Sequence, residues 1–505
     1  MTTETAHRHH SAEELANLAK KQLSEILSRT EPPKPKDRLA IPAQEMPAQD
    51  PNVRRKNMSE VASGYTADQA RLEALRCLQC KNAPCMAGCP VRIDIPGFVD
   101  AIARNDFQKA IGIIKRNSLL PAVCGRVCPQ ETQCQEPCTV GKSLKDVEKS
   151  VSIGRLERFV ADWERENVKM KAPEVKPPTG KKVAVIGSGP ASLVVAADVR
   201  REGHAVTVFE AFHKPGGVMI YGIPEFRLPK KIVQMEIDTL TAMGVEIKTN
   251  FVVGRTRKLK DLMDKDGYGA VFIGTGAGLP KFMNIEGENL VGVFSANEYL
   301  TRSNLMKAYD RERAHTPIYA SKKVAVLGGG NVAMDAARTA VRLGAEEVHI
   351  IYRRTEKEMP ARIEEVGHAK EEGVIFNTLE NARRLIGNEY GCVTHMECLR
   401  YELGEPDSSG RRKPVEIKGS EFMREFDTVI VAIGNDSNPL IKQTTSGLNT
   451  TKWGNIIVDE NQKTSIDGVF AGGDIVLGAA TVILAMGEGR RAAKSINDLL
   501  AKQNP

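Results

Sequence analysis

The sequence lacks several features that mark common classes of protein. Its most apolar stretch, residues 469–487, has Asp474 in its middle and several glycines, so no transmembrane helix is expected. The opening MTTETAHRHHSAEEL is polar, with no apolar segment of signal-peptide length behind it, which favours the cytoplasm. The net charge is +7, but lysine and arginine form no dense block with interleaved aromatic residues. Binding to nucleic acid is therefore not expected.

The placement of the cysteines is the next constraint. Eight of the ten cysteines lie between Cys77 and Cys138. Disulfide bonds are rare in the cytoplasm, so these thiols are predicted to bind metal. Cys392 and Cys398 stand apart at a spacing that matches no redox or zinc motif, and we expect them to be ordinary thiols. A chain of 505 residues is long enough for about three domains.

The N-terminal part is expected to contain one helix and an extended connection. Residues 11–28 are predicted to be helical, because Ser11 and Glu14 form a capping-box pair and apolar residues recur behind them at helical spacing. Residues 31–51 are rich in proline and charge, which favours an extended segment. A compact domain is expected from about residue 60, and residues 172–180 are typical of a linker.

Two runs of closely spaced cysteines follow. The first has the spacing Cys-x2-Cys-x4-Cys-x3-Cys-Pro, close to that of bacterial ferredoxins, and consists of Cys77, Cys80, Cys85 and Cys89. In such runs the fourth cysteine tends to bind another cluster, so a second set of ligands is required. That set consists of Cys124, Cys128, Cys134 and Cys138. Eight thiols suffice for two four-iron clusters; zinc sites or disulfides fit the irregular Cys-Pro runs less well.

A glycine turn after an apolar strand at 183–186 has the pattern of a Rossmann fold. It consists of Gly187, Ser188, Gly189, Pro190, Ala191 and Ser192. The first two glycines allow a tight turn and the close approach of a pyrophosphate, which then meets N–H groups at the start of a helix. Glu210, after the second strand, can accept hydrogen bonds from an unphosphorylated adenosine ribose. This unit suits FAD or NAD.

The same pattern returns after an apolar strand at 324–327. The second turn consists of Gly328, Gly329, Gly330, Asn331 and Val332. The next strand, at 348–352, ends in Arg353 and Arg354 where an NAD site would place its acid, and guanidinium groups there suit a 2′-phosphate. A solvated basic pair at a strand end is the alternative. The position of Arg353 and Arg354 at the end of this strand favours NADPH over NADH.

A third motif, Phe-Ala-Gly-Gly-Asp, ends at Asp474 late in the chain. Its carboxylate can bind the ribityl hydroxyls of a flavin, and the N-terminus of the next helix can face the flavin ring. We assign Gly473, Asp474, Thr481 and Val482 to the FAD site. Because this segment lies beyond the NADPH unit, that unit is predicted to be inserted within the FAD domain.

Together these motifs resemble the NADPH-oxidising small subunit of glutamate synthase and its relatives, which include the iron–sulfur and flavin region of dihydropyrimidine dehydrogenase. The resemblance runs from about residue 36 to the end. It rests on CLQCKNAPCMAGCP, GRVCPQETQC, SIGRLERFVADW, GGVMIYGIPEFRLP, GGGNVAMDAARTA, YRRTEKEMPAR and FAGGDIVLGAATVILAMGEGRRAA. The wide spacing from Cys128 to Cys138 is more similar to the large subunit of the electron-bifurcating NADH-dependent ferredoxin:NADP oxidoreductase, which is an alternative.

The resemblance implies a set of cluster ligands that differs from eight thiolates. One cluster would be held by Cys77, Cys80, Cys85 and Cys138. The other would be held by Cys89, Cys128, Cys134 and Glu157. Cys124 would then be a spare thiol, and the oxygen ligand would change the charge and hydrogen bonding that set a cluster's potential. The alternative for Glu157 is a surface carboxylate on a helix.

The resemblance also adds residues to the two nucleotide sites. Around FAD it adds Gly216, Gly217, Arg227 and Val253, and in the nucleotide crevice Ala432 and Gly434. The predicted fold is multidomain: a helical domain with two [4Fe–4S] clusters, then two Rossmann-type α/β domains. The segments are an N-terminal extension and linker at 1–59, the iron–sulfur domain at 60–172, the FAD domain at 181–300 and 431–505, and the NADPH domain at 301–430.

The predicted function is that of an NADPH-dependent flavin and iron–sulfur oxidoreductase. NADPH gives two electrons as a hydride, whereas a four-iron cluster accepts one, so a flavin is needed between them. The NADPH unit has no Cys-x-x-Cys, which disfavours a disulfide reductase. A non-catalytic electron-transfer or scaffold subunit is the rival from another class. The resemblance implies an electron-exchanging partner, which is a glutamate synthase large subunit or a small flavin and [2Fe–2S] subunit. Because some relatives are homo-oligomers that act without a large chain, a homo-oligomer is an alternative.

Overall fold

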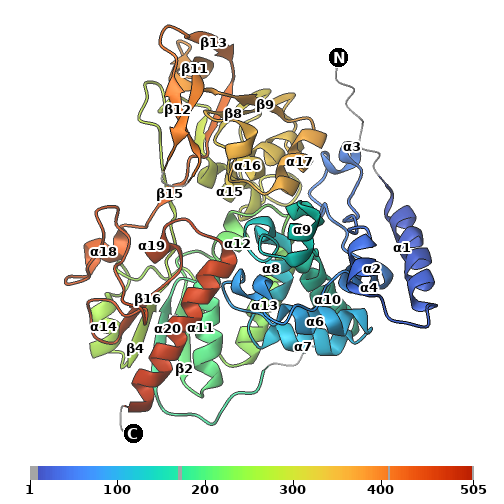
Figure 1. Cartoon of the computed structure of the whole chain (residues 1–505). Coiled ribbons are helices and arrows are strands. Elements are labelled where there is room, and N and C mark those ends of the chain that lie inside the picture. The colour runs from blue at the N-terminus through green and yellow to red at the C-terminus, as the bar shows by residue number, and fades with distance from the viewer. Residues whose placement is uncertain (1–9, 169–172, 408–409, 503–505) are drawn as a thin grey trace, which may run out of the picture. The chain divides into compact units, whose positions relative to one another are not determined.

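The computed structural model of the chain describes residues 10–168, 173–407 and 410–502. The described residues form two compact units, and Figure 1 labels many of their helices and strands. Unit 1 takes in those within 1–50, 60–173 and 481–487, and unit 2 takes in those within 51–59, 174–480 and 488–505. Each unit is described by itself.

Unit 1 is helical, as predicted for the cysteine-rich region. Its elements are α1 (Ala12–Leu27), α2 (Pro35–Ala40), α4 (Ala67–Leu75), α5 (Pro84–Ala87), α6 (Ile95–Ala103), α7 (Phe107–Lys115), α8 (Pro121–Val127), η1 (Gln130–Thr132), α9 (Thr139–Leu144), η2 (Val147–Lys149) and α10 (Ile153–Asn167). Proline opens α2, α5 and α8, where its missing N–H costs no helical hydrogen bond.

The predicted N-terminal helix is confirmed as α1. The N–H of Glu14 donates to the Ser11 hydroxyl, and the N–H of Ser11 donates to the Glu14 carboxylate at 2.8 Å. The apolar face of α1 is also packed as predicted, because its Leu23 is buried with Leu72 of α4. A capping box and one apolar stripe are therefore enough to place this helix.

The segment 31–51, predicted to be extended, is only partly so. It contains α2, which begins at Pro35 and is capped by Asp37, whose carboxylate accepts a hydrogen bond from the Lys34 N–H at 3.0 Å. Proline fixes a helical φ at that position, and the cap satisfies one of the first N–H groups. The richness in proline and charge therefore did not exclude a short capped helix in this segment.

Unit 2 contains two parallel five-stranded sheets. The first has the order β16-β4-β1-β2-β3, with β1 (Lys182–Ile186), β2 (Ala205–Phe209), β3 (Glu246–Lys248), β4 (Ala270–Ile273) and β16 (Val469–Ala471). Most residues of β1 and all of β4 are apolar and buried, as in sheets covered on both faces. The helix α11 (Pro190–Arg201) follows β1 after the first glycine turn.

The second sheet repeats this arrangement. It has the order β6-β14-β7-β8-β9, with β6 (Val293–Ser295), β7 (Lys323–Leu327), β8 (Glu347–Tyr352), β9 (Ile375–Thr378) and β14 (Thr428–Val431). The helix α16 (Asn331–Arg342) follows β7 after the second glycine turn. Because β6 pairs with β14, this sheet includes residues on the N-terminal side of the predicted boundary at 301.

The first sheet is interrupted in the sequence. Its strand β16 pairs with β4 only after the chain has passed through every strand of the second sheet. Parallel strands require long crossover connections, and here one crossover contains a whole sheet. This order is the one that an inserted domain would produce.

A smaller antiparallel sheet packs beside the second parallel sheet. It consists of β10 (Glu380–Gly387), β11 (Val393–Pro406), β12 (Arg412–Glu416) and β13 (Phe422–Glu425), and a separate pair joins β5 (Leu279–Pro280) to β15 (Asn435–Asp436). One core contains Leu385 and Met396 from this sheet and Leu327 from β7. Cys398 is buried in the same core, where burial raises the pKa of its thiol to about 12, as suits an ordinary structural thiol.

The remaining elements connect these sheets or cover them. They are α3 (Pro51–Arg54), α12 (Val218–Tyr221), α13 (Lys230–Ala242), α14 (Leu259–Asp264), α15 (Ala296–Asn304), η3 (Glu356–Glu358), α17 (Ile363–Glu371), α18 (Leu440–Thr444), α19 (Asp474–Leu477) and α20 (Val482–Lys502). Residues 51–59, predicted to be a linker, belong to unit 2, and Arg54 is fully buried there. Across the described ranges, no helix combines the length and apolar character needed to cross a membrane.

Candidate cofactor sites

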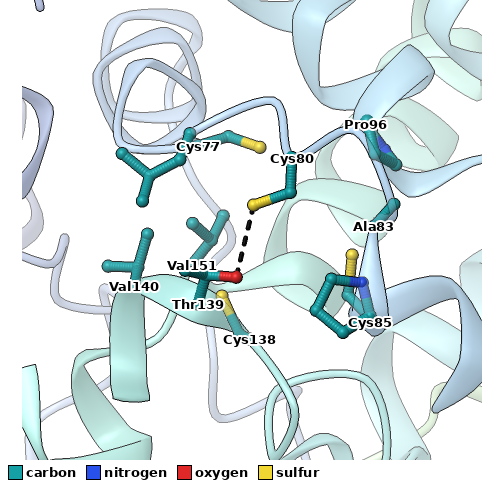
Figure 2. A pocket seen from close by; sticks show the side chains of 11 residues that line it. Cys77, Cys80, Ala83, Cys85, Pro96, Cys138, Thr139, Val140 and Val151 are labelled. Carbon is teal, nitrogen blue, oxygen red and sulfur yellow. Dashed lines mark hydrogen bonds between the residues drawn. The ribbon is translucent and has the colours of Figure 1, made fainter. Parts of the chain in front are cut away.

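Four cysteine thiols line one pocket of unit 1, with about 300 Å³ of space that includes its open side (Figure 2). They are Cys77, Cys80, Cys85 and Cys138. The rest of the wall is mostly apolar and consists of Leu78, Ala83, Pro84, Pro96, Thr139, Val140 and Val151. The structure therefore brings together the four thiols that the resemblance assigns to one cluster, although Cys138 is far from the others in sequence.

The chemistry of this pocket fits a cluster. Burial raises the pKa of the Cys77 thiol to about 11 and that of the Cys85 thiol to about 12, and the Cys138 thiol nearby adds to both shifts. Thiolates packed together in an apolar pocket are costly unless a cation neutralises them. Iron supplies that charge, and an apolar surround is one of the factors that tune a cluster's potential.

A second group lies elsewhere in unit 1 and consists of Cys89, Cys128, Cys134 and Glu157. Burial raises the pKa of Cys134 well above its ordinary value, and the charges of Cys128, Cys89, Glu157 and, least of these, Cys85 add to that shift, so these groups lie near Cys134. Among the described residues, no three His, Cys, Asp or Glu side chains converge closely enough for a single metal ion. A cluster bonds each ligand to a different iron, so it does not require that convergence.

The helix α10 buries Glu157. Its residues Leu156 and Val160 are fully buried, and its Phe159 meets the edge of Phe107 at 5.0 Å between ring centroids. The Glu157 side chain lies on this inward side, and burial raises its pKa to about 8. Its Oε1 is buried and has no hydrogen-bond partner among the described residues. The surface-carboxylate alternative is therefore wrong.

Leaving a buried carboxyl oxygen unpaired costs about 1–3 kcal/mol, and a ligand bound to this oxygen would remove that cost. Cys124, on α8, lies beside the same group. A hydrogen bond with Cys128 lowers the pKa of the Cys124 thiol, but burial and the neighbouring Glu157 raise it overall. Its Sγ lies 3.5 Å from Sδ of Met486. These contacts suit a packed thiol and leave the roles of Cys124 and Glu157 as predictions.

The first glycine turn has the geometry of a phosphate cradle. Gly187 has a φ of +91°, and a Cβ there would lie 2.5 Å from the Gly274 carbonyl oxygen, so only glycine fits. Gly189 caps α11 with extended backbone, and a Cβ there would meet no atom within 4 Å. Ser192 at the third position has its hydroxyl 3.5 Å from the Gly274 carbonyl. The open side of Gly189 is where a pyrophosphate would approach.

The predicted FAD residues from three segments meet at this turn. The Ser188 hydroxyl donates to Glu210 and accepts a hydrogen bond from the Gly216 N–H at 2.9 Å. A Cβ on Gly217 would lie 2.8 Å from the Gly189 Cα, so these two glycines touch. The carboxylate, the glycine pair and the turn thus form one site, as the resemblance implies.

Asp474 and a residue that the sequence analysis missed lie near this site. Burial raises the pKa of Asp474 to about 6. It also raises the pKa of Tyr221 to about 12, with the charges of Asp474 and Glu210 adding to the shift. Tyr221 is therefore close to both carboxyl groups. Its position in GGVMIYGIPEFRLP, four residues after the glycine pair, was the available signal.

The other predicted FAD residues are placed as follows. Gly473 donates its N–H to Glu488 at 3.0 Å, and Val253 is buried in the core beneath the first sheet. Thr481 and Val482 lie at the start of α20, in the part of the chain that belongs to unit 1. The role of all four residues at FAD stays a prediction.

Arg227 forms ion pairs with two buried acids, and its predicted role at FAD stays a prediction. Its Nη1 donates to both carboxylate oxygens of Asp335, at 2.8 and 2.7 Å, and its Nε lies 3.3 Å from Glu365. Both acids belong to helices beside the second sheet. Sequence position next to a flavin loop could not predict this ion pair, because Asp335 is 108 residues away.

The second glycine turn has the same character as the first. Gly328 has a φ of +143°, and a Cβ there would lie 2.3 Å from the carbonyl oxygen of Ala432, so the two predicted residues adjoin. A Cβ on Gly329 would meet the Tyr352 ring at 2.8 Å. Gly330 caps α16, and a Cβ there would find its nearest neighbour at 3.8 Å. Open space again borders the helix N-terminus.

The side chains around this turn differ in exposure. Asn331 accepts a hydrogen bond from the Arg362 N–H at 3.0 Å, whereas Val332 is 39% exposed. A Cβ on Gly434 would find no atom within 4 Å. The turn and the Gly434 loop are therefore accessible, and their contact with a nucleotide stays a prediction.

The two predicted arginines are not equivalent. Arg354 is buried, its Nη2 lies 2.6 Å from Asp407, and its Nε donates to the Arg412 carbonyl at 2.8 Å. Arg353 is exposed. The sequence analysis assigned both arginines to the nucleotide. Strand alternation alone does not reveal that the β11–β12 connection covers Arg354.

Comparisons with known proteins agree with this arrangement. Residues 54–169 match the family described as dihydropyrimidine dehydrogenase domain II, 4Fe-4S cluster, and residues 181–489 match pyridine nucleotide-disulphide oxidoreductase. The glutamate synthase [NADPH] small chain of Azospirillum brasilense is 36% identical over 463 residues, which cover 90% of this chain and 94% of that protein. The chain belongs to the glutamate synthase small-chain family. The same protein of Escherichia coli K12 is also 36% identical, over 89% of this chain and 95% of that one.

Other members of the group are longer. The NADP(+)-dependent formate dehydrogenase subunit beta of Moorella thermoacetica is 41% identical over 83% of this chain, which spans 60% of that protein. Among solved structures, Mycobacterium tuberculosis FprA in complex with NADPH has a TM-score of 0.53 and 19% identity, covering 65% of this chain and 85% of that one, which shows a shared fold. Membership in the family confirms the predicted oxidoreductase with FAD, pyridine nucleotide and [4Fe–4S] clusters as cofactors.

Proposed function

We propose that this chain oxidises NADPH with FAD and passes the electrons singly through two four-iron clusters to a partner subunit. The observation that carries the proposal is the pair of glycine turns in unit 2, each with an open side at the N-terminus of a helix. FAD supplies the conversion from hydride transfer to single-electron transfer. The residues described above bind and orient the cofactors and exclude water.

The first parallel sheet forms the proposed FAD domain. Ser188 and Glu210 lie where the adenosine ribose would bind, and Gly189 leaves room for the pyrophosphate. Tyr221 lies close to Asp474 and Glu210, and in this proposal Asp474 and Tyr221 would contact the ribityl and ring parts of the flavin. The second sheet, with Gly330 and Arg353, forms the proposed NADPH domain, inserted between β4 and β16.

Two ligand sets are proposed for the clusters in unit 1. The first is Cys77, Cys80, Cys85 and Cys138, supported by their shared pocket. The second is Cys89, Cys128, Cys134 and Glu157, supported by their mutual charge effects and by the unpaired Glu157 oxygen. An oxygen ligand would give the second cluster a different potential from the first.

The proposed partner is a glutamate synthase large subunit, because the family relatives of matching length are named as small chains of that enzyme. The formate dehydrogenase subunit indicates that the same module also serves other enzymes. The spacing from Cys128 to Cys138 is the one observation that favours the electron-bifurcating alternative, and the comparisons give that alternative no better support. We further propose a cytoplasmic location.

Nucleotide choice gives the first testable prediction. Arg353→Ala should raise the KM for NADPH about 10- to 100-fold and leave the KM for NADH nearly unchanged, because a charge-assisted bond to the 2′-phosphate contributes about 1.5–3 kcal/mol. Arg354→Ala should instead lower the melting temperature, because it removes the ion pair between the buried Arg354 guanidinium and Asp407. Steady-state reduction of a dye acceptor with both nucleotides measures the KM values, and thermal unfolding measures the melting temperature. Equal losses for NADPH and NADH in Arg353→Ala would contradict the assignment.

Cofactor content tests the function as a whole. Purified without oxygen, the chain should contain one FAD and about eight irons with matching sulfide, as two four-iron clusters require. NADPH should bleach the flavin absorbance and NADH should do so much more slowly. A protein that contains FAD and iron but is not bleached by either nucleotide would be the non-catalytic electron-transfer subunit. Zinc in place of iron would contradict the cluster assignment.

A further inference from the structure

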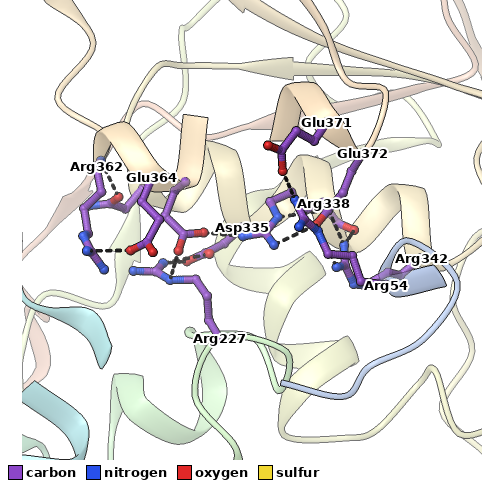
Figure 3. Close-up of polar contacts among 11 residues, drawn as sticks. Arg54, Arg227, Asp335, Arg338, Arg342, Arg362, Glu364, Glu371 and Glu372 are labelled. Atoms are coloured by element: carbon purple, nitrogen blue, oxygen red, sulfur yellow. Dashed lines mark hydrogen bonds and ion pairs between the residues drawn. The ribbon is translucent and has the colours of Figure 1, made fainter. Parts of the chain in front are cut away.

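Unit 2 contains a buried charge cluster that no cofactor site explains (Figure 3). The cluster consists of Arg54, Arg227, Arg338, Arg342, Asp335, Glu365, Glu371 and Glu372. Four guanidinium groups thus face four carboxylates, and the side chains of Arg54, Arg338 and Arg342 are 1% exposed or less. We name this set the arginine cluster.

Glu372 is the centre of the arginine cluster. It accepts hydrogen bonds from Arg54 Nε at 2.9 Å, from Arg338 Nη2 at 2.8 Å and from Arg342 Nη1 at 2.6 Å. Burial would raise the pKa of Glu372, but the hydrogen bonds from Arg342 and Arg338 hold it far below its ordinary value. Glu372 is therefore ionised and joins three cations that come from two segments of the chain.

Two segments outside the second sheet bind to its helices through this cluster. One is the strap, residues 51–59, which inserts Arg54 and whose Asn57 carbonyl accepts a hydrogen bond from Arg342 Nε at 3.0 Å. Arg54 Nη2 also lies 2.5 Å from Glu371. The strap thus contacts α16 through Arg342 and the end of α17 through both acids.

The other segment is the loop that follows the glycine pair of the proposed FAD site. Its Phe226 ring is fully buried and lies 3.9 Å from the Arg342 guanidinium and 4.8 Å from that of Arg338. Next to it, Arg227 makes the two bonds to Asp335 of α16. The two segments therefore hold α16 from the flavin loop and from the strap.

The position of α16 matters because this helix begins at the second glycine turn. Asp335, Arg338 and Arg342 follow Asn331 at about one-turn intervals, so the cluster contacts successive turns of the helix behind the nucleotide site. Buried ion pairs contribute little net stability compared with apolar residues, but their directional bonds fix one geometry. Such a cluster is better suited to setting the position of a helix than to stabilising the fold.

We propose that Arg54 is a positioning residue for hydride transfer. By bonding to Glu372 it orients Arg338 and Arg342, and these fix α16 and its glycine turn relative to the flavin loop that carries Phe226. Arg54 contacts neither cofactor in this arrangement. The inference rests on the proposed function, and an error of about 1 Å in the placement of reacting groups can cost about 100-fold in rate.

The test compares two ways of reducing the flavin in the complete, FAD-loaded protein. Arg54→Met should reduce the rate of flavin bleaching by saturating NADPH about 10- to 100-fold, while dithionite, which does not use the nucleotide site, should bleach it at the wild-type rate. The affinity for NADP⁺ should change by less than about 3-fold, because the glycine turn itself is intact. Arg384→Met, which removes an arginine bonded to Glu397 on the antiparallel sheet, is the matched control and should leave both rates unchanged.

Arg54→Lys provides a variant that keeps the charge and loses the planar fork, and its NADPH rate should lie between those of the wild type and Arg54→Met. The proposal would be overturned if both folded variants, Arg54→Met and Arg54→Lys, bleached the flavin with NADPH at rates within about 3-fold of wild type. It would also be overturned if bleaching by NADPH and by dithionite slowed equally, because that result indicates general damage. Failure of the proposed function looks different. In that case NADPH would not bleach the wild-type flavin, or NADP⁺ would not bind to it.

Discussion

Gly189→Ala is expected to weaken FAD binding strongly and to leave the protein folded. The backbone at Gly189 is extended, which any residue adopts, and an added Cβ would meet no protein atom within 4 Å. The methyl group would instead occupy the space through which a pyrophosphate approaches the start of α11. We expect an affinity loss of about 100-fold or more, equivalent to about 3 kcal/mol. Flavin content after purification and the melting temperature of the apoprotein measure the two effects.

Two further glycines provide controls for that experiment. Gly187→Ala should impair folding itself, because its φ is +91° and the Cβ would lie 2.5 Å from a carbonyl oxygen. Gly330→Ala should leave FAD bound and weaken NADPH, because it occupies the corresponding position in the second turn. If Gly189→Ala retained FAD at wild-type affinity, the first turn would not be the pyrophosphate site.

Glu157→Ala should reduce the iron content from about eight to about four atoms per chain, because it removes the proposed fourth ligand of one cluster. Flavin reduction by NADPH should survive, since the flavin accepts the hydride before any cluster is involved. Cys124→Ser should retain all the iron, because the proposed ligand set leaves that thiol without a bond to iron. Iron and sulfide analysis, with EPR of the reduced protein, distinguishes the variants.

Glu166→Ala is the matched control for Glu157→Ala, because Glu166 lies on the same helix with its side chain 69% exposed. A surface carboxylate of this kind typically contributes less than about 0.5 kcal/mol, so iron content and EPR should not change. The opposite pattern, with iron lost in Cys124→Ser and kept in Glu157→Ala, would establish eight thiolate ligands and refute the proposed set.

Local patterns predicted much of this protein. Gly187 and Gly328 could be recognised because a left-handed backbone between a strand and a helix excludes a side chain, which is a requirement of a few adjacent residues. The capping pair Ser11 and Glu14 placed α1 for a similar reason. The family itself was recognised from such motifs, and the comparisons confirmed it.

Other features depended on contacts between distant segments. Arg353 and Arg354 are adjacent in sequence, yet only Arg354 is covered, by residues about 53 to 58 positions away. The burial of Glu157 could not be predicted from the motif SIGRLE, because helical spacing gives a face but not what packs on it. Arg54 appeared to lie in a linker, and its partners Glu371 and Glu372 are more than 300 residues distant.

The sequence by itself determined the cofactor classes and the family, because cluster ligation and phosphate binding impose short-range requirements on spacing and backbone conformation. Spacing alone left open which thiols share a pocket, and although the resemblance implied the set, only the tertiary structure shows it, since Cys138 joins Cys77 after the helices between them have packed. The tertiary structure also decided that Arg54 belongs to the helices of the second sheet. Burying a guanidinium requires carboxylates arranged around it in three dimensions, and that condition is satisfied by the fold as a whole and leaves no local signature.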